Sequence, residues 1–114
     1  MAPQITHSLT DEILRLSIDE DELTYAVADV CRTIINEAIA EGVYKFVINL
    51  NLAEYIDSTF IAALLVLNQQ AKRNDSKVKL VGVGDRVGTV LHHVRIRESF
   101  DEHETVEDAV ASFG

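Results

Sequence analysis

The stretch from Lys45 to Leu67, KFVINLNLAEYIDSTFIAALLVL, decides the fold of this chain. It begins with apolar side chains that alternate little with polar ones, which is typical of a central strand covered on both faces. It ends with FIAALLVL, an unbroken apolar run that predicts a helix buried around most of its circumference at the start. The small oxygen-bearing residues Asp57-Ser58-Thr59 lie between the two runs. We therefore predict a strand over Lys45 to Leu50, a polar turn, and a helix from Ser58 to about Arg73.

The rest of the chain alternates between strand patterns and helix patterns. Residues 1–11 are polar and are expected to form an extended lead-in. The further predicted elements are a strand over Glu12 to Ile18, an amphipathic helix over about Glu22 to Glu41, a strand over Lys77 to Val83, a short helix after Asp85, a brief edge strand over Ser99 to His103, and a final helix capped by Thr105. Such alternation implies an α/β fold with a mostly parallel sheet and crossover helices.

Length, charge and composition narrow the class of protein. A chain of 114 residues with 47% apolar content is long enough for one domain, 1–114, with a core of its own. The net charge of −9 argues against direct contact with nucleic acid and fits either general solubility or a basic protein partner. The single Cys31 cannot form an internal disulfide, and we expect it to be a small core residue in a cytoplasmic protein. The N-terminus lacks a secretory pattern, and no apolar run approaches the roughly 20 residues of a membrane span.

The turn at Asp57-Ser58-Thr59 is the strongest candidate site. It follows a central strand and opens a helix, the place where ligands and reactive groups collect in open α/β sheets. A phosphate on Ser58 would lie near free backbone N–H groups and the positive end of the helix. The alternative is purely structural, because Asp57 or Ser58 in this place can serve only as a helix N-cap.

The other patterns give weaker evidence of a functional site. The acidic run from Asp19 to Glu22 could hold a cation together with Asp57, as in a phosphoacceptor receiver domain, but the late strand offers no lysine and acids at a helix start are the better account. Gly82 and Gly84 predict a tight turn, not a dinucleotide fingerprint. His92 and His93 are neighbours on a helix, where they point apart and make a poor metal site. With no nucleophile–base pair, metal cluster or cofactor motif, the sequence favours a binding protein over an enzyme.

With those residues placed, the chain resembles the STAS domains, and among them the bacterial anti-sigma factor antagonists. The strand and turn of the opening stretch are similar to the family's strand followed by V-x-Y-I-D-S-S-G. The matching pieces, in chain order, are Leu16-Ser17 with Asp21 and Thr24, Val47-Ile48-Asn49-Leu50, Ala53-Glu54-Tyr55-Ile56-Asp57-Ser58-Thr59, Lys79-Leu80-Val81-Gly82-Val83, and Glu104-Thr105-Val106-Glu107-Asp108-Ala109. The resemblance covers nearly the whole chain and implies helices packed mainly on one face of the sheet.

The resemblance also implies a function. In that family an anti-sigma factor that is also a serine kinase binds the domain and phosphorylates the serine after the motif's aspartate, which breaks the complex, and a phosphatase restores it. By position, Ser58 is the phosphoacceptor. Asp57 would orient the Ser58 hydroxyl or contact a basic group on the partner. Thr59 occupies the position of the family's second hydroxyl residue, and Asp21 occupies the position of an acidic residue near the same end of the sheet. The resemblance also allows a homodimer.

One departure from the family pattern bears on this expectation. Where the family has Gly-Leu-Gly after the two hydroxyl residues, this chain has Phe60-Ile61-Ala62. The Phe60 ring could cover Ser58, or it could form part of an apolar docking patch for a partner. The alternative function is therefore a STAS scaffold that is not phosphorylated and that self-associates or serves a larger signalling or transport complex.

Overall fold

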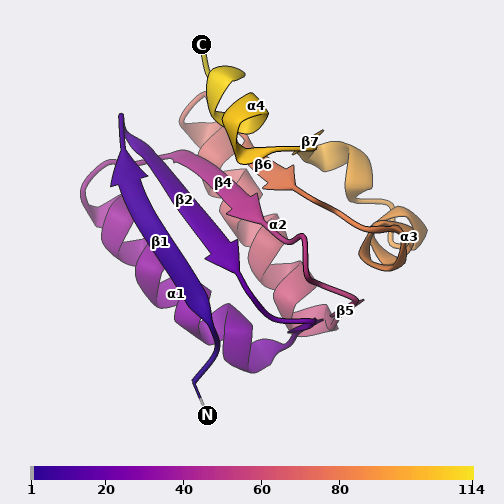
Figure 1. Cartoon of the computed structure of the whole chain (residues 1–114). Helices are drawn as coiled ribbons and strands as arrows, with labels where there is room; N and C mark the ends of the chain where they lie inside the picture. The colour runs from indigo at the N-terminus through magenta and orange to yellow at the C-terminus, as the bar shows by residue number, and fades with distance from the viewer. Residues whose placement is uncertain (1) are drawn as a thin grey trace.

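The computed structural model describes residues 2–114, so residue 1 of the expected domain and lead-in lies outside the described range. A five-stranded sheet runs through the middle of the molecule in the order β1-β2-β4-β6-β7 (Figure 1). Its strands are β1 (Ile5–Thr10), β2 (Ile13–Ile18), β4 (Lys45–Asn49), β6 (Val78–Val81) and β7 (Asp101–His103). The pairs from β2 to β7 are parallel and only β1 is antiparallel to its neighbour, so the predicted mostly parallel α/β fold is confirmed.

The helices are divided unequally between the two faces of the sheet. α1 (Tyr25–Ala40) and α2 (Ser58–Arg73) pack side by side on one face and enclose the main core (Figure 1). The short α4 (Val106–Ala111) packs on the other face, where Ala109 contacts a small cluster with Val47 and Val81. The expectation that helices pack mainly on one face is confirmed. α3 (Asp85–His93) and the 3-10 turn η1 (Arg97–Ser99) form the connection between β6 and β7.

The polar lead-in is a strand of the sheet, which the sequence pattern did not predict. β1 pairs with β2 along its whole length through a two-residue turn at Asp11 and Glu12. Both turn residues have positive φ, 54° and 65°, which is the conformation of a type I′ hairpin turn. That turn normally carries Asn-Gly or Asp-Gly, so a Thr-Asp-Glu sequence gave no hairpin signal.

A second, two-stranded parallel sheet lies at the end of the main sheet, and the sequence did not predict it either. β3 (Glu22–Leu23) pairs with β5 (Tyr55–Ile56), with Leu23 opposite Ile56. Because residues 22 and 23 belong to this strand, α1 begins at Tyr25, three residues later than expected from periodicity. Strands of two residues are too short to leave a periodic pattern, and they exist here only because two loops meet.

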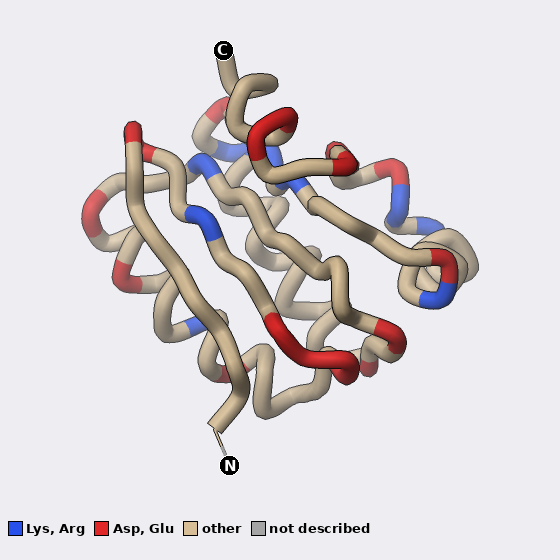
Figure 2. Tube along the Cα trace, viewed as in Figure 1, with Lys and Arg blue, Asp and Glu red and all other residues tan. Residues whose placement is uncertain are grey.

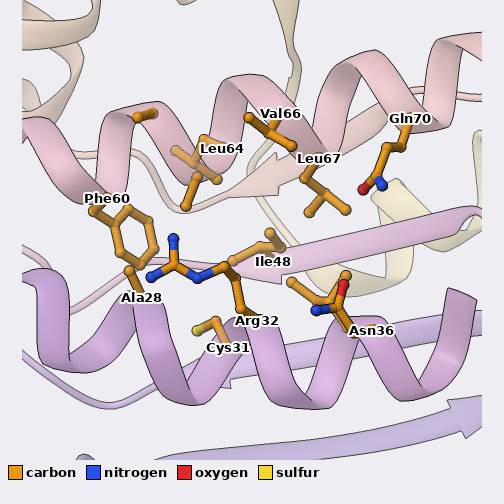
Figure 3. A pocket seen from close by; sticks show the side chains of 13 residues that line it. Ala28, Cys31, Arg32, Asn36, Ile48, Phe60, Leu64, Val66, Leu67 and Gln70 are labelled. Carbon is orange, nitrogen blue, oxygen red and sulfur yellow. The ribbon is translucent and has the colours of Figure 1, made fainter.

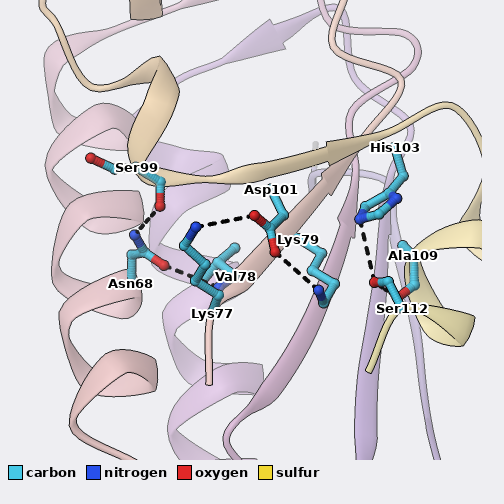
Figure 4. A network of polar contacts seen from close by, with 9 residues as sticks. All are labelled: Asn68, Lys77, Val78, Lys79, Ser99, Asp101, His103, Ala109 and Ser112. Carbon is cyan, nitrogen blue, oxygen red and sulfur yellow. Dashed lines mark hydrogen bonds and ion pairs between the residues drawn. The ribbon is translucent and has the colours of Figure 1, made fainter. Parts of the chain in front are cut away.

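Asn68 is a polar residue of α2 whose side chain is only 3% exposed. The amide nitrogen donates to the carbonyl of Ser99 at 2.8 Å, and the amide oxygen accepts the N–H of Val78 at 3.0 Å (Figure 4). Asn68 therefore ties α2 to the start of β6 and to η1, which is how a buried amide is normally satisfied.

Gly82 explains the close approach of two loops near the site described below. It has a φ of +70°, and a Cβ there would lie 2.7 Å from the Cβ of Asn51 in the β4–β5 connection. The absence of a side chain lets the chain after β6 pack directly on this connection. No helix in residues 2–114 combines the length and apolar character needed to cross a bilayer.

Candidate functional site

Two connections at the carboxyl ends of β2 and β4 meet and fix the predicted turn in space. The backbone carbonyl of Asp21 accepts hydrogen bonds from the N–H groups of Glu54, at 2.7 Å, and Tyr55, at 3.0 Å. One step further on, the N–H of Asp57 donates to the carbonyl of Leu23 at 2.9 Å. The β3–β5 pairing thus holds Asp57 beside the chain that enters α1. Asp21, whose side chain is exposed, contributes to the site through its carbonyl oxygen.

The carboxylate of Asp57 caps two helices at once. Its Oδ1 accepts the N–H of Phe60 in the first turn of α2 at 2.8 Å, as the sequence allowed for an N-cap. Its Oδ2 accepts the N–H of Tyr25 at 3.0 Å, although Tyr25 begins α1, 32 residues earlier. The N-cap residue of α1, Thr24, makes no side-chain cap of its own. Asp57 therefore replaces that missing cap and locks the two helix N-termini together.

Ser58 and Thr59 form the exposed first turn of α2. Both side chains face solvent, whereas Asp57 before them is half-buried. Within residues 2–114, the carboxylate and carbonyl of Asp57 accept the N–H groups of Phe60 and Ile61, leaving those of Ser58 and Thr59 available. Free N–H groups and the positive end of the helix dipole make this turn suited to a bound or covalent phosphate.

Phe60 lies in the core. Its side chain is 2% exposed, and Ser58 is exposed beside it, so the ring does not cover the serine. The ring extends from α2 toward Ala28 on α1 and lines an apolar cavity of about 300 Å³ between these helices (Figure 3). The expectations that Phe60 covers Ser58 or forms part of an exposed docking patch are therefore wrong. Helical periodicity explains the burial, since Phe60 shares one face of α2 with Leu64, Leu67 and Ala71.

The surroundings of Ser58 are acidic. The acidic residues 19–22, which follow β2, gather at one end of the molecule (Figure 2). Glu54 lies beside them, since its N–H donates to the carbonyl of Asp21. Arg86 at the start of α3 approaches Glu54 at 3.7 Å, but both side chains are largely exposed and such a pair contributes little. Across residues 2–114, no three acidic, histidine or cysteine side chains lie close enough to hold a metal ion.

Three exposed apolar residues that the sequence did not single out lie on the elements that form this turn and on the connection leading to it. Tyr25 is 65% exposed, Tyr55 is 53% exposed and Leu52 is 51% exposed. Tyr25 begins α1, Tyr55 begins β5, and Leu52 lies in the connection between β4 and β5. For Tyr25 the sequence did contain a signal of exposure, because this residue falls outside the apolar stripe of its helix. Exposed aromatic side chains around a rigid turn are typical of protein-binding surfaces.

A family model for the STAS domain matches residues 4–109. The chain belongs to the STAS domain family. No curated protein sequence matches it significantly. The match covers both α1 and α2 and every strand of the main sheet, so the fold and the turn described above are those of a STAS domain.

Solved STAS structures share the fold at low sequence identity. SpoIIAA, an anti-sigma factor antagonist from Bacillus, matches in its unphosphorylated form with a TM-score of 0.82 and 17% identity, over 96% of each chain. An anti-sigma factor antagonist domain protein from Planctomyces limnophilus gives 0.81 and 18%, over 96% of this chain and 97% of that one. A sulfate transporter family protein from Wolinella succinogenes gives 0.76 and 19%, over 92% and 87%. The TM-scores, at identities this low, establish the common fold.

Proposed function

We propose that this STAS domain is an anti-sigma factor antagonist that binds an anti-sigma factor with serine kinase activity and is released when Ser58 is phosphorylated. The observation that carries the proposal is the exposed Ser58 hydroxyl at the first position of α2, on a turn fixed by the Asp57 carboxylate. SpoIIAA, which shares the fold, is known in an unphosphorylated and a phosphorylated form. A phosphatase would restore the unmodified state.

Partner binding would use the surface around Ser58. Tyr25, Tyr55 and Leu52 supply exposed apolar area, and the carboxylates of residues 19–22 and Glu54 supply negative charge. A partner with a basic rim around an apolar centre complements that surface. The serine hydroxyl must also reach the partner's nucleotide, which requires an exposed acceptor on a rigid element.

Phosphorylation would weaken this contact by placing a bulky, strongly hydrated group in its apolar centre. A phosphoserine carries about −2 charge, and the helix N-terminus stabilises it within the antagonist. At the interface the same group adds bulk and a charge that must be desolvated when the partner covers Ser58. The modification thus stabilises the free domain and destabilises the complex, as an off-switch requires.

Phosphosite mapping after incubation with the cognate kinase and ATP tests the acceptor. We expect one phosphate on the wild-type chain, none on Ser58→Ala, and normal labelling of Thr59→Ala. Unchanged labelling of Ser58→Ala would disprove the Ser58 assignment. Affinity for the kinase, measured by calorimetry, should fall at least ~10-fold in Ser58→Asp, equivalent to about 1.4 kcal/mol.

The second candidate is a scaffold that is not phosphorylated, and the fold shared with a sulfate transporter family protein favours it. In that case the partner binds wild type and Ser58→Asp equally well, and the kinase leaves Ser58 unmodified. A partner that binds wild type and not Ser58→Asp excludes a passive scaffold.

A further inference from the structure

The two edges of the main sheet differ in how they are protected from pairing with another chain. β7 has three residues, two of which are acidic, and α4 begins just after it. β1 has six residues, ITHSLT, with no charge and no proline, and five of them are exposed. Long, uncharged edge strands present a row of free N–H and carbonyl groups and readily pair with a further strand. Only the β1 edge is left open in this way.

The pairing of β1 with β2 determines which of its backbone groups face outward. The N–H of Asp19 donates to the carbonyl of Gln4 at 2.8 Å, so Gln4 and Asp19 form a hydrogen-bonded pair. Such pairs alternate along an antiparallel ladder, which directs the backbone groups of Thr6, Ser8 and Thr10 toward β2. The N–H and carbonyl groups of Ile5, His7 and Leu9 therefore point away from the sheet, where residues 2–114 provide no further strand.

We propose that the β1 edge binds the β1 edge of a second copy of this chain, antiparallel and centred on His7, to give one continuous ten-stranded sheet. In this register His7 faces His7 of the other copy, and Ile5 faces Leu9. All three outward-facing residues of each strand then form hydrogen-bonded pairs. In a register centred on Thr6 or Ser8, only two of the three outward-facing residues form such pairs. A register centred on Thr6 also places Pro3, which has no N–H, opposite Leu9.

The side chains of β1 are complementary to themselves in the same register. Ile5, His7 and Leu9 share the face of the sheet that α1 covers, since they lie opposite Ile18, Leu16 and Leu14 of the core. Leu9 is 47% exposed in the single chain and would pack against Ile5 of the other copy. On the opposite face Thr6 meets Ser8. Apolar and hydroxyl cross-strand pairs of this kind stabilise antiparallel sheets.

Disulfide trapping tests both the contact and its register. Directly opposed Cα atoms in an antiparallel ladder are about 4.5–5.5 Å apart, within the range of a disulfide. We expect His7→Cys to form a covalent dimer on mild oxidation. Thr6→Cys and Ser8→Cys should not dimerise alone, because equal positions would be about 8 Å apart, but a mixture of the two should give the mixed dimer. Intact mass separates the mixed dimer from the two homodimers.

Wild type is the matched control for these experiments, because its Cys31 is buried and burial raises the pKa of the thiol to about 12. Cross-linking of Thr6→Cys or Ser8→Cys alone as readily as His7→Cys would overturn the register. His7→Cys that cross-links no more than wild type would overturn the contact itself.

Sedimentation over a concentration series provides a test without cysteines. The wild-type mass should rise toward twice that of one chain. His7→Pro removes only an outward N–H, which an edge strand tolerates, and should stay a folded monomer. Leu9→Lys places a charge at the same edge and should have the same effect if the proline variant fails to fold.

A wild-type chain that remains a monomer would overturn the proposal, and so would a dimer that persists in both variants. A monomer whose β1 binds a foreign peptide strand would assign the edge to another partner. The edge contact does not involve Ser58. Kinase labelling of Leu9→Lys therefore tests phosphorylation of Ser58 separately from dimerisation.

Discussion

Asp57 shows how a single side chain can fix the turn that carries Ser58. Its two carboxylate oxygens accept N–H groups from the first turns of α1 and α2, so the position of Ser58 is set by both helices. From the sequence, Asp57 was a candidate for contact with a partner, for orienting the serine, or for a helix N-cap, and the N-cap of α2 is confirmed. The structure assigns its oxygens to the backbone, and the residue shapes the turn from within.

Loss of both caps should be costly in Asp57→Ala. One N-cap is worth roughly 1 kcal/mol, so we expect the free energy of unfolding in urea to fall by about 2 kcal/mol. Asp57→Asn retains one acceptor oxygen and should lose about half of that. Thr105→Ala is the matched control, because Thr105 caps only α4 by accepting the N–H of Asp108 at 3.1 Å. A cost for Asp57→Ala no larger than that for Thr105→Ala would contradict the double cap.

At the level of elements, the predictable parts were those whose sequence pattern is local. The alternation of β2, the continuous apolar run of β4 and the three- and four-residue spacing of α1 each arise from burial of one face or two, and all three were predicted. β1 and the β3–β5 pair depend on contacts between distant segments. Phe60 was misjudged for a different reason: its helical spacing with Leu64, Leu67 and Ala71 predicts burial, but its place in the family motif suggested a surface role.

The β1–β2 hairpin contains strain that a substitution can relieve. Glu12 has a φ of +65°, a left-handed conformation that costs a residue with a side chain about 1 kcal/mol and glycine almost nothing. We therefore expect Glu12→Gly to raise the free energy of unfolding by no more than about 0.6 kcal/mol, because the larger entropy of glycine in the unfolded chain offsets at least ~0.4 kcal/mol of the strain that is relieved. Thermal unfolding followed by circular dichroism measures the change.

Glu41→Gly is the control for the hairpin, because Glu41 is exposed and ends α1 with a φ of −94°. There the same substitution relieves no strain and should stabilise nothing. Equal effects at the two positions would show that the turn is not strained. A rigid hairpin also matters for the edge contact, since β1 is attached to the sheet only through β2.

A cluster of ion pairs lies at the end of the parallel strands opposite Ser58. The carboxylates near Ser58 lie at the carboxyl ends, while Lys77 and Lys79 lie at the start of β6 at the other end (Figure 2). Asp101 of β7 accepts from Lys77 at 3.1 Å and from Lys79 at 3.0 Å (Figure 4). The Lys79 side chain is 8% exposed, and its ammonium also lies 4.5 Å from the centre of the Phe113 ring. This cluster joins β6, β7 and the C-terminal residues.

The pH dependence of stability should reveal that cluster. Burial tends to raise the pKa of Asp101, but hydrogen bonds from Lys79 and Lys77 outweigh it and hold the pKa below the ordinary 3.8. Because the folded pKa is the lower one, the stabilisation is present in full above pH 3.8 and is lost as the pH falls through the folded pKa. Asp101→Asn should therefore be less stable than wild type at pH 6, with a gap that narrows below pH 3.8 in urea titrations. Glu107→Gln, at an exposed position of α4, should show no such convergence, and a pH-independent gap for Asp101→Asn would contradict the role of the ion pairs.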